Sequence, residues 1–359
     1  MAEVLTSVSG GLGRLTLNRP DALHALTVGM CAAMTEALLA WKDDPAVGAI
    51  LIEHAPGTRG FCAGGDIRML AESGKKDGAE ARHFFFTEYQ LNHLLMVYPK
   101  PVLALMDGVT MGGGVGISLP AKFRVVTERT NFAMPETGIG LFPDVGGGWH
   151  LPRLPGKVGL WLALTGARLK GGDCIAAGIG THYMASERLE RVRAAAESAA
   201  GMNVPLASLA GAVTALAQDP GAPKELAPEN RDRIDRLFAG ESVAAIFRAL
   251  AEDGSDWAKA QLATLETKSP QTLEVAFRQL AEGEKAADFA ANMRMEFRIA
   301  ARVAQRHDFL EGVRAVIIDK DNAPRWFPPT LAGVTGAMLD EIFAPLPADQ
   351  EWTPLPALS

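Results

Sequence analysis

Two acidic residues in one segment rich in proline and glycine are the side chains best suited to catalysis. Glu136 and Asp144 lie in the sequence MPETGIGLFPDVGGG, whose prolines and glycines argue against a continuous helix. Apolar residues flank both acids, and carboxylates in such surroundings are seldom buried without a partner or a function. If the two meet, the pKa of one should rise, giving an acid and a base near neutral pH. Capping or salt-bridged acids are the structural alternative.

Two glycine-rich loops could supply backbone N–H groups that stabilise a negatively charged oxygen. Phe61–Asp66 follows an apolar run and precedes an expected helix, for which Asp66 is a suitable N-cap. Asp107–Gly116 follows a second apolar run and contains three consecutive glycines at 112–114. Free N–H groups at helix starts bind phosphates or oxyanions, and two such loops could aim at one oxygen. Close packing of a helix on a sheet would demand the same glycines.

Other common catalytic patterns are absent from the sequence. Neither loop contains the phosphate-binding pattern GxxxxGK[ST], and Ile117 replaces the third glycine of a dinucleotide-binding loop. Ser118 is outside any GxSxG motif, and the scattered histidines form no HExxH pair. We therefore expect no metal site.

Composition narrows the class of protein and its partners. The chain has 359 residues, 48% of them hydrophobic and 21% charged, with a net charge of −7, which is typical of a globular protein and unfavourable for binding nucleic acid. The spacing of Cys31, Cys62 and Cys174 fits neither a zinc site nor a disulfide framework. We see no signal peptide and no apolar stretch of about 20 residues, so we expect a cytoplasmic protein without a membrane partner.

The elements that must position these residues alternate between strands and helices in the first half of the chain. Short apolar runs predict the strands, and apolar residues at helical spacing predict the helices. The expected strands are 14–17, 47–53, 102–106 and 123–127, and the expected helices are 27–41 and 79–97. Thr27 is a suitable N-cap for the first helix. Strands separated by helices predict an α/β fold.

Helical patterns dominate after residue 185. The expected helices are 186–200, 230–238, 243–251, 269–281 and 286–305. Ser269 followed by proline is a typical N-cap. We therefore expect two regions, a core at 1–185 that carries the loops and the acids and a mostly helical region at 186–359 packed on it. The second region either supports the core or contributes directly to the site.

Three of these segments, taken in order, resemble the crotonase superfamily, which is the enoyl-CoA hydratase/isomerase fold. The segments are FCAGGDI at 61–67, MGGGVG at 111–116 and PETGIGLFPDVGG at 135–147. The likeness continues through SPQTLEVAFRQL and the following EFRIAARVAQRHDFLEGVRAVIIDKDNAPRW, so it covers essentially the whole chain. The resemblance implies a spiral of ββα units with a helical C-terminal region, and an acyl-CoA thioester as substrate.

Carried over by position, the resemblance assigns roles to particular residues. It implies that the N–H groups of Gly65 and Gly113 form an oxyanion hole, that Glu136 is the catalytic glutamate and that Asp144 is a second acid. Further contacts to the substrate and its coenzyme A would come from Ala63, Asp66, Arg68 and Gly112. Candidate cations for the phosphates are Arg19, Arg59 and Arg68. The family more often has asparagine at the position of His24, near the expected path of coenzyme A.

Two positions favour hydrolysis over hydration. Hydratases of the superfamily have a second glutamate at the position of Gly116 and usually glycine at the position of Asp144. This pattern resembles the branch that hydrolyses short 3-hydroxyacyl-CoA thioesters, with 3-hydroxyisobutyryl-CoA the expected substrate. Glu136 would attack the carbonyl or activate a water, and no cofactor is expected beyond the coenzyme A of the substrate. The alternatives are an isomerase or hydratase that uses Glu136 alone and a CoA-binding protein without turnover. A homo-oligomer is compatible with all three.

Overall fold

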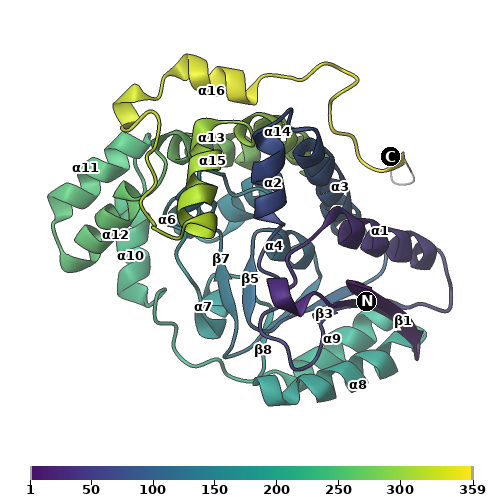
Figure 1. The fold of residues 1–359 in the computed structure, drawn as a ribbon. Helices are drawn as coiled ribbons and strands as arrows, with labels where there is room; N and C mark the ends of the chain where they lie inside the picture. Colours follow the sequence, from purple (N-terminus) through teal and green to yellow (C-terminus); the bar gives the residue numbers. More distant parts are fainter. Residues whose placement is uncertain (1, 357–359) are drawn as a thin grey trace.

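A six-stranded sheet forms the centre of the structure, a computed structural model that describes residues 2–356 (Figure 1). Its strands lie in the order β1-β2-β3-β4-β6-β8, with β1 and β2 antiparallel and every other pair of neighbours parallel. The strands of the second, two-stranded sheet, β5 and β7, are also parallel. The eight strands are β1 (Val4–Ser9), β2 (Leu12–Leu17), β3 (Ala49–His54), β4 (Val102–Met106), β5 (Val109–Met111), β6 (Phe123–Val126), β7 (Asn131–Ala133) and β8 (His182–Tyr183).

Helices alternate with these strands and then continue alone to the end of the chain. Those up to residue 185 are α1 (Val28–Lys42), α2 (Ile67–Gly74), α3 (Ala79–Met96), α4 (Gly113–Ser118), α5 (Gly147–His150), α6 (Val158–Thr165) and α7 (Gly171–Ala176), with short 3-10 turns at η1 (Pro20–Ala22), η2 (Glu136–Ile139) and η3 (Leu151–Arg153). Those that follow are α8 (Leu189–Ala200), α9 (Pro205–Leu216), α10 (Pro228–Leu237), α11 (Val243–Asp253), α12 (Asp256–Glu266), α13 (Pro270–Glu284), α14 (Phe289–Val303), α15 (His307–Val313) and α16 (Gly336–Phe343), with short turns at η4 (Ser186–Arg188), η5 (Arg314–Ile318) and η6 (Leu331–Gly333).

Side chains of the central strands are apolar on both faces of the sheet. Ile50 and Ile52 of β3 belong to the large core shared with α1 and α3. Leu51, between them, belongs to a second core with Leu103 and Val125, which α8 and α9 cover. Figure 1 shows these two helices at the lower edge of the molecule. Because both faces must be covered, the strands read as continuous apolar runs, which is typical of parallel sheets.

The α/β alternation expected from the sequence is confirmed, and several boundaries agree closely. The strand expected at 102–106 has those limits, and Thr27 caps α1 by accepting a hydrogen bond from the Met30 amide at 3.1 Å. The helix expected from residue 186 begins at Leu189, because η4 occupies the preceding three residues. The apolar patterns do not predict β1, α9 or α12, since most of the side chains of these elements are not buried.

The helices after residue 185 lie on two sides of the core. While α8 and α9 cover one face of the sheet, α13 packs on α5 and α6, and α14 packs on α3 and α5. The chain then runs back along the core to Trp352, which is fully buried and donates a hydrogen bond to the Phe86 carbonyl at 3.2 Å. The helical region therefore reaches the elements that carry the catalytic candidates.

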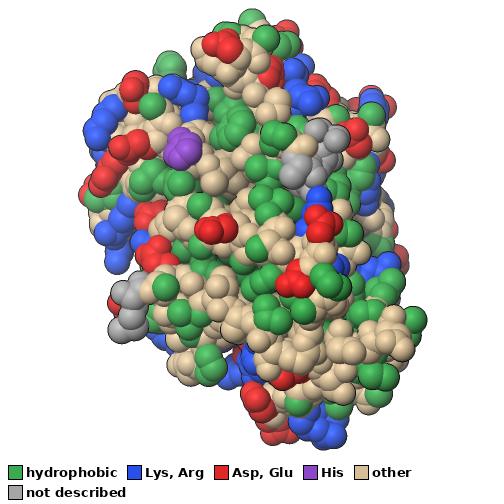
Figure 2. Space-filling model, turned by 90° about the vertical axis from the view of Figure 1, so that its right-hand side faces the viewer, with side chains coloured by type: hydrophobic (Ala, Val, Ile, Leu, Met, Phe, Trp, Pro, Cys, Tyr) green, Lys and Arg blue, Asp and Glu red, His purple; other side chains and the backbone are tan. Residues whose placement is uncertain are grey.

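Basic and acidic side chains are interspersed on the face drawn in Figure 2, with no continuous basic stripe on that face. No helix among residues 2–356 is both long and apolar enough to cross a membrane.

Candidate active site

The two glycine-rich loops lie against each other, joined by backbone hydrogen bonds. The amides of Phe61 and Cys62 each donate to the Val109 carbonyl at 2.9 Å, and the Met111 amide donates to the Cys62 carbonyl at 3.0 Å. Both loops follow parallel strands, β3 and β4, and the carboxyl ends of parallel strands meet at one edge of a sheet. The juxtaposition expected from the sequence is therefore present.

Close approach of the loops explains two of the glycines. A Cβ atom on Gly114 would lie 2.3 Å from the Cys62 carbonyl oxygen, which leaves no room for a side chain. Gly112 has a φ of 45° with ψ of −120°, a conformation open mainly to glycine. The packing explanation for these glycines therefore holds, and it is compatible with binding an anion.

The amides of Gly65 and Gly113 have no hydrogen-bond partner among residues 2–356, and both glycines border one cavity. Gly113 is the first residue of α4, where a helix leaves its N–H groups unpaired. Hydrogen bonds from the Leu26 amide to the Gly64 carbonyl at 2.7 Å and from the Asp66 amide to the Leu26 carbonyl at 3.0 Å hold the first loop on its outer side. The free amides can therefore stabilise an oxyanion.

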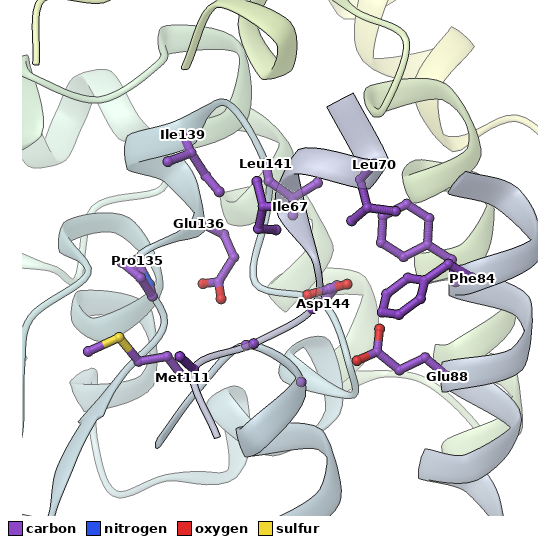
Figure 3. Close-up of a pocket in the computed structure, with 16 residues that line it drawn as sticks. Ile67, Leu70, Phe84, Glu88, Met111, Pro135, Glu136, Ile139, Leu141 and Asp144 are labelled. Carbon is purple, nitrogen blue, oxygen red and sulfur yellow. The ribbon is translucent and has the colours of Figure 1, made fainter. Parts of the chain in front are cut away.

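Glu136 and Asp144 both line the cavity that these glycines border. Glu136 begins η2, and Asp144 lies in the following loop before α5. Both side chains point into the cavity (Figure 3). Apolar side chains from α2, α3, β5 and the η2 segment line much of the rest of it: Ile67, Leu70, Phe84, Phe85, Met111, Pro135, Ile139 and Leu141. Ala63 and Gly112, expected to contact the substrate, border the same cavity.

Burial raises the pKa values of both acids. Asp144 is 4% exposed, and burial raises its pKa to about 7, although a hydrogen bond from Tyr89 lowers it. Burial also raises the pKa of Glu136 well above its usual range, and the charge of Asp144 adds to that rise. Ionisation of one acid therefore opposes ionisation of the other, so the pair can hold a proton and a charge together near neutral pH.

Two polar groups on α3, Tyr89 beside Asp144 and Glu88 in the cavity wall, were not among the residues predicted from the sequence. Tyr89 donates a hydrogen bond from its hydroxyl to Asp144 Oδ2 at 2.9 Å. Glu88, the preceding residue, lines the cavity, and its Oε1 atom has no hydrogen-bond partner among the described residues. The signal available in the sequence was a glutamate among the apolar residues of a helix, at helical spacing from Phe84 and Phe85.

Glu296, from the helical region, anchors the loop that carries Asp144. It lies on α14, is fully buried and accepts hydrogen bonds from the amides of Gly146 at 2.7 Å and Gly148 at 2.8 Å. Asn292 and Gln279 donate to the same carboxylate at 2.9 Å and 3.1 Å. The region after residue 185 therefore contributes to the geometry of the site.

Asp66 and Arg68 lie outside the residues that line the cavity. Asp66 caps α2, as expected, and pairs with Arg19 at 2.8 Å. Arg68 is exposed and donates a long hydrogen bond of 3.4 Å to the Ile317 carbonyl. Arg59 is also exposed. Their proposed contacts with coenzyme A stay predictions.

His24 lies in the turn before the first loop, in an unusual backbone conformation. Its φ is 59°, in the left-handed region that asparagine and histidine tolerate better than most residues. Its ring is fully buried, accepts a hydrogen bond from the Arg19 amide at 3.0 Å and contacts the Thr58 hydroxyl at 2.8 Å. Burial lowers the pKa of His24 to about 4, so the ring is neutral. Its visible role is to shape the turn before the first loop.

The position of Gly116 has no room for a second glutamate in this packing. A Cβ atom there would lie 2.6 Å from Val145 Cβ and 2.7 Å from Asn92 Nδ2. Among residues 2–356 no group of three or more His, Cys, Asp or Glu side chains could hold a metal ion. The chemistry that this arrangement supports is therefore stabilisation of an oxyanion beside two coupled carboxyl groups.

This chain belongs to the enoyl-CoA hydratase/isomerase family, whose model matches residues 12–343. Its fold is that of the crotonase superfamily. A solved structure described as a carnitinyl-CoA dehydratase from Mycobacterium thermoresistibile has a TM-score of 0.89 and 42% identity, with 98% of each chain covered. One described as an enoyl-CoA hydratase from Rhodobacter sphaeroides has a TM-score of 0.88 and 38% identity, with 98% of this chain and 99% of the other covered.

Other proteins similar to this chain bear a more specific name. A mitochondrial 3-hydroxyisobutyryl-CoA hydrolase of Danio rerio is 45% identical over 349 residues, which are 96% of this chain and 90% of the relative. The protein of the same name from Homo sapiens is 44% identical over 347 residues, with 96% and 89% covered.

The cytoplasmic location expected from the sequence is contradicted by these relatives, which are named mitochondrial. That expectation was wrong because it relied on the cysteines and on the missing signal peptide. All three cysteines are free and buried. Free cysteines indicate a reducing environment and do not distinguish one reducing compartment from another.

Proposed function

We propose that this protein hydrolyses the thioester of a short 3-hydroxyacyl-CoA, with 3-hydroxyisobutyryl-CoA as the first substrate to test. Relatives of 43–47% identity that bear the name 3-hydroxyisobutyryl-CoA hydrolase support this over about 96% of the chain. The observation that carries the proposal is the pairing of Asp144 with Glu136 in one cavity, together with glycine at position 116.

In this proposal the amides of Gly65 and Gly113 hold the thioester carbonyl oxygen while it becomes an oxyanion. Each well-placed donor of this kind lowers the barrier by about 2.7–4 kcal/mol. Either Glu136 adds to the carbonyl carbon to form an anhydride that water later cleaves, or it removes a proton from a water that adds directly. In both routes the carbon–sulfur bond breaks and the leaving thiolate takes up a proton.

Asp144 is suited to a second role because its pKa of about 7 lets it exchange a proton near neutral pH. When protonated, it can deliver the proton that the leaving thiolate needs. When ionised, it raises the pKa of Glu136 and so strengthens that carboxylate as a base. The reaction as proposed uses only the acyl-CoA and water, without a separate cofactor.

Hydration or dehydration of an acyl-CoA double bond is the second candidate, because two solved structures of 42% and 38% identity are described as a dehydratase and a hydratase. The packing around Gly116 argues against it, since the second glutamate of the two-glutamate mechanism would collide with Val145 and Asn92. A CoA-binding protein without turnover is a third alternative, and the retained acids argue against it.

Release of free thiol decides among these functions. 3-Hydroxyisobutyryl-CoA and 3-hydroxypropionyl-CoA are incubated with the protein and a thiol reagent, and loss of the conjugated double bond of crotonyl-CoA is followed in parallel. We expect thiol from the first two substrates and no hydration of the third. Hydration of crotonyl-CoA without thiol release contradicts the proposal in favour of the second candidate. Binding of all three without any reaction favours the third.

A further inference from the structure

Glu88 is a buried acid in the cavity for which the protein supplies no visible partner. Its side chain is 2% exposed, and its Oε1 atom has no hydrogen-bond partner among residues 2–356. Leaving a buried polar group unsatisfied costs about 1–3 kcal/mol, and more for a charged one. Replacing it by an apolar residue would remove this cost, so its presence beside the apolar lining residues Phe84 and Phe85 points to a ligand.

Glu296 shows what a purely structural acid looks like in the same fold. It is as deeply buried as Glu88, yet two backbone amides and two side-chain amides donate to its carboxylate. Glu88 has none of these donors, although it lies one residue before Tyr89, which is fully engaged with Asp144. The contrast indicates that Glu88 awaits a group that enters the cavity.

The position of Glu88 relative to the free amides limits which group that can be. A Cβ atom on Gly113 would lie 2.5 Å from Glu88 Oε1, so this oxygen is beside the amide proposed to hold the thioester carbonyl. In the view of Figure 3 the Glu88 carboxyl lies below the ring of Phe84, and Asp144 lies between it and Glu136. The charge of Asp144 acts on both glutamates. Glu136 also lies beside the second loop, since a Cβ atom on Gly112 would lie 3.4 Å from Glu136 Oε1.

The length of a short acyl chain fits this position. With the carbonyl oxygen at Gly113, a hydroxyl on the third carbon extends roughly 3.5 Å from the carbonyl carbon, as ordinary bond lengths give. That hydroxyl is the polar group of the acyl part other than the thioester itself. The apolar residues around Glu88, Phe84 and Leu70 would contact the methylene and methyl groups instead.

We propose that Glu88 binds the 3-hydroxyl group of the acyl chain and so selects 3-hydroxyacyl thioesters over acyl thioesters that lack this hydroxyl. This inference rests on the proposed function, because it assigns the acyl part of that substrate to the cavity. A site built to hydrogen-bond a substrate hydroxyl discriminates strongly against an analogue without it, since the buried group of the site is then left unpaired. Burial and the charge of Asp144 raise the pKa of Glu88, so the neutral acid can both donate to the hydroxyl and accept from it.

The test compares binding of two non-reactive ligands that differ only in the hydroxyl. Ketone analogues of 3-hydroxyisobutyryl-CoA and isobutyryl-CoA, with a methylene in place of the thioester sulfur, are titrated by calorimetry. The proteins are the wild type, Glu88→Leu, Glu88→Met and Glu88→Gln. Glu80→Leu, an exposed acid on the same helix, is the matched control, and thermal unfolding of each variant is measured alongside.

We expect the wild type and Glu80→Leu to bind the hydroxylated analogue at least about tenfold more tightly, which is the contribution of one buried hydrogen bond. In Glu88→Leu and Glu88→Met that preference falls to under about threefold, through weaker binding of the hydroxylated analogue and unchanged or tighter binding of the other. Glu88→Gln, which can still donate and accept, restores part of the preference. Having two apolar variants keeps the test valid where one of them fails to fold.

An unchanged preference in the folded apolar variants overturns the inference, as does equal loss of affinity for both analogues. A wild type without preference for the hydroxyl overturns it as well. Thiol release by the wild type, assayed separately, keeps the two proposals apart. A wild type that cleaves no thioester but shows a Glu88-dependent preference defeats the proposed function and leaves the role of Glu88 standing.

Discussion

A hydrogen bond from Tyr89 counteracts the rise that burial causes in the pKa of Asp144. Burial raises the pKa of Asp144 to about 7, and the bond from the Tyr89 hydroxyl is the largest contribution that lowers it. In the proposed reaction one of the two carboxyl groups must be ionised. We therefore expect kcat/KM to rise as the pH increases through about 7. This rising limb of the pH profile reports the ionisation of Glu136 and Asp144 as a pair, because the charge on one carboxylate disfavours ionisation of the other.

Removal of the Tyr89 hydroxyl should therefore move the rising limb of kcat/KM for thiol release to higher pH. Tyr89→Phe keeps the ring in its packing and deletes the donor that stabilises the ionised form of Asp144. The matched control is Tyr98→Phe, which loses a hydrogen bond of 2.7 Å to the Leu38 carbonyl, outside the cavity. A limb that stays in place in Tyr89→Phe, or that moves equally in Tyr98→Phe, contradicts this assignment.

Replacement of Glu136 by glutamine should abolish most of the activity. Glu136→Gln is expected to lower kcat for thiol release about a hundredfold or more, because an amide is neither a nucleophile nor a base. Circular dichroism and the affinity for free coenzyme A should remain those of the wild type. Thr137 follows Glu136, and its hydroxyl donates to the Leu164 carbonyl at 3.1 Å, so Thr137→Val is a control for disturbance of η2. Turnover near the wild-type level in Glu136→Gln removes this residue from the chemistry.

The pKa of Asp144 also predicts how stability depends on pH. Its folded pKa of about 7 is raised above the ordinary 3.8, so the unfolded chain releases this proton first as pH rises. Stability from this group is full below about pH 4 and is lost as pH rises toward 7. Asp144→Asn should therefore unfold at a higher temperature than the wild type at pH 8 and at a similar one at pH 4. Equal differences at both pH values would show that the acid is not buried in this way.

At the residue scale, the sequence predicted the groups that motifs mark and missed those that only packing reveals. Glu136, Asp144 and the free amides lie in segments of unusual composition, so their convergence could be anticipated. Glu88 and Glu296 lie on helices and differ from surface glutamates only by their position on an apolar face. The apolar pattern of a single helix does not show which residues pack against its apolar face. The sequence therefore could not predict that Glu88 lacks a partner or that Glu296 has four donors.

At the scale of elements, the loop that carries Asp144 is held by a helix more than a hundred residues later in the chain. Gly146 and Gly148 donate to Glu296 on α14, and the Pro143 carbonyl accepts from Gln279 on α13 at 2.7 Å. These bonds fix the loop on either side of the acid. Sequence periodicity predicted both helices, but their pairing with this loop depends on tertiary packing, which local pattern does not contain.

Glu296→Gln should loosen this loop and lower activity without removing any group that touches the substrate. The amide nitrogen of glutamine cannot accept a hydrogen bond, so one of the two glycine amides loses its acceptor. We expect kcat for thiol release to fall about tenfold, the pH of the rising limb to shift, and the unfolding temperature to change by a few degrees. Of these three readouts, only the shift in the pH of the rising limb reports on the ionisation of Asp144 itself.

The control is Glu282→Gln on the neighbouring helix α13, whose carboxylate forms an exposed ion pair with Arg278 at 2.7 Å. That substitution should change the activity and the limb by little, because exposed pairs contribute about 0–1 kcal/mol. A Glu296→Gln variant that loses stability but keeps the wild-type pH profile would restrict Glu296 to a role in folding.

At the scale of the whole molecule, the helical region is part of both hydrophobic cores. On one side, α8 and α9 bury the face of the sheet that contains Leu51, Leu103 and Val125. On the other, α13 and α14 pack against α3, α5 and α6. The expected boundary at residue 185 therefore marks a change of composition, from alternating strands and helices to helices alone, and it divides elements that share their cores.

This sharing predicts that the chain unfolds as one unit and that residues 1–185 do not fold alone. A fragment that ends at residue 185 would expose one whole apolar face of a parallel sheet, and such faces must be covered. It would also lose both hydrogen bonds that the amides of Gly146 and Gly148, in the loop of Asp144, donate to Glu296. We expect the full chain to show a single calorimetric transition whose calorimetric and van't Hoff enthalpies agree.

The fragment should bind hydrophobic dyes and show no cooperative transition, and addition of separately produced residues 186–359 should restore some thiol release. Two resolved transitions in the full chain, or a monomeric 1–185 fragment that melts cooperatively, would establish two independent domains.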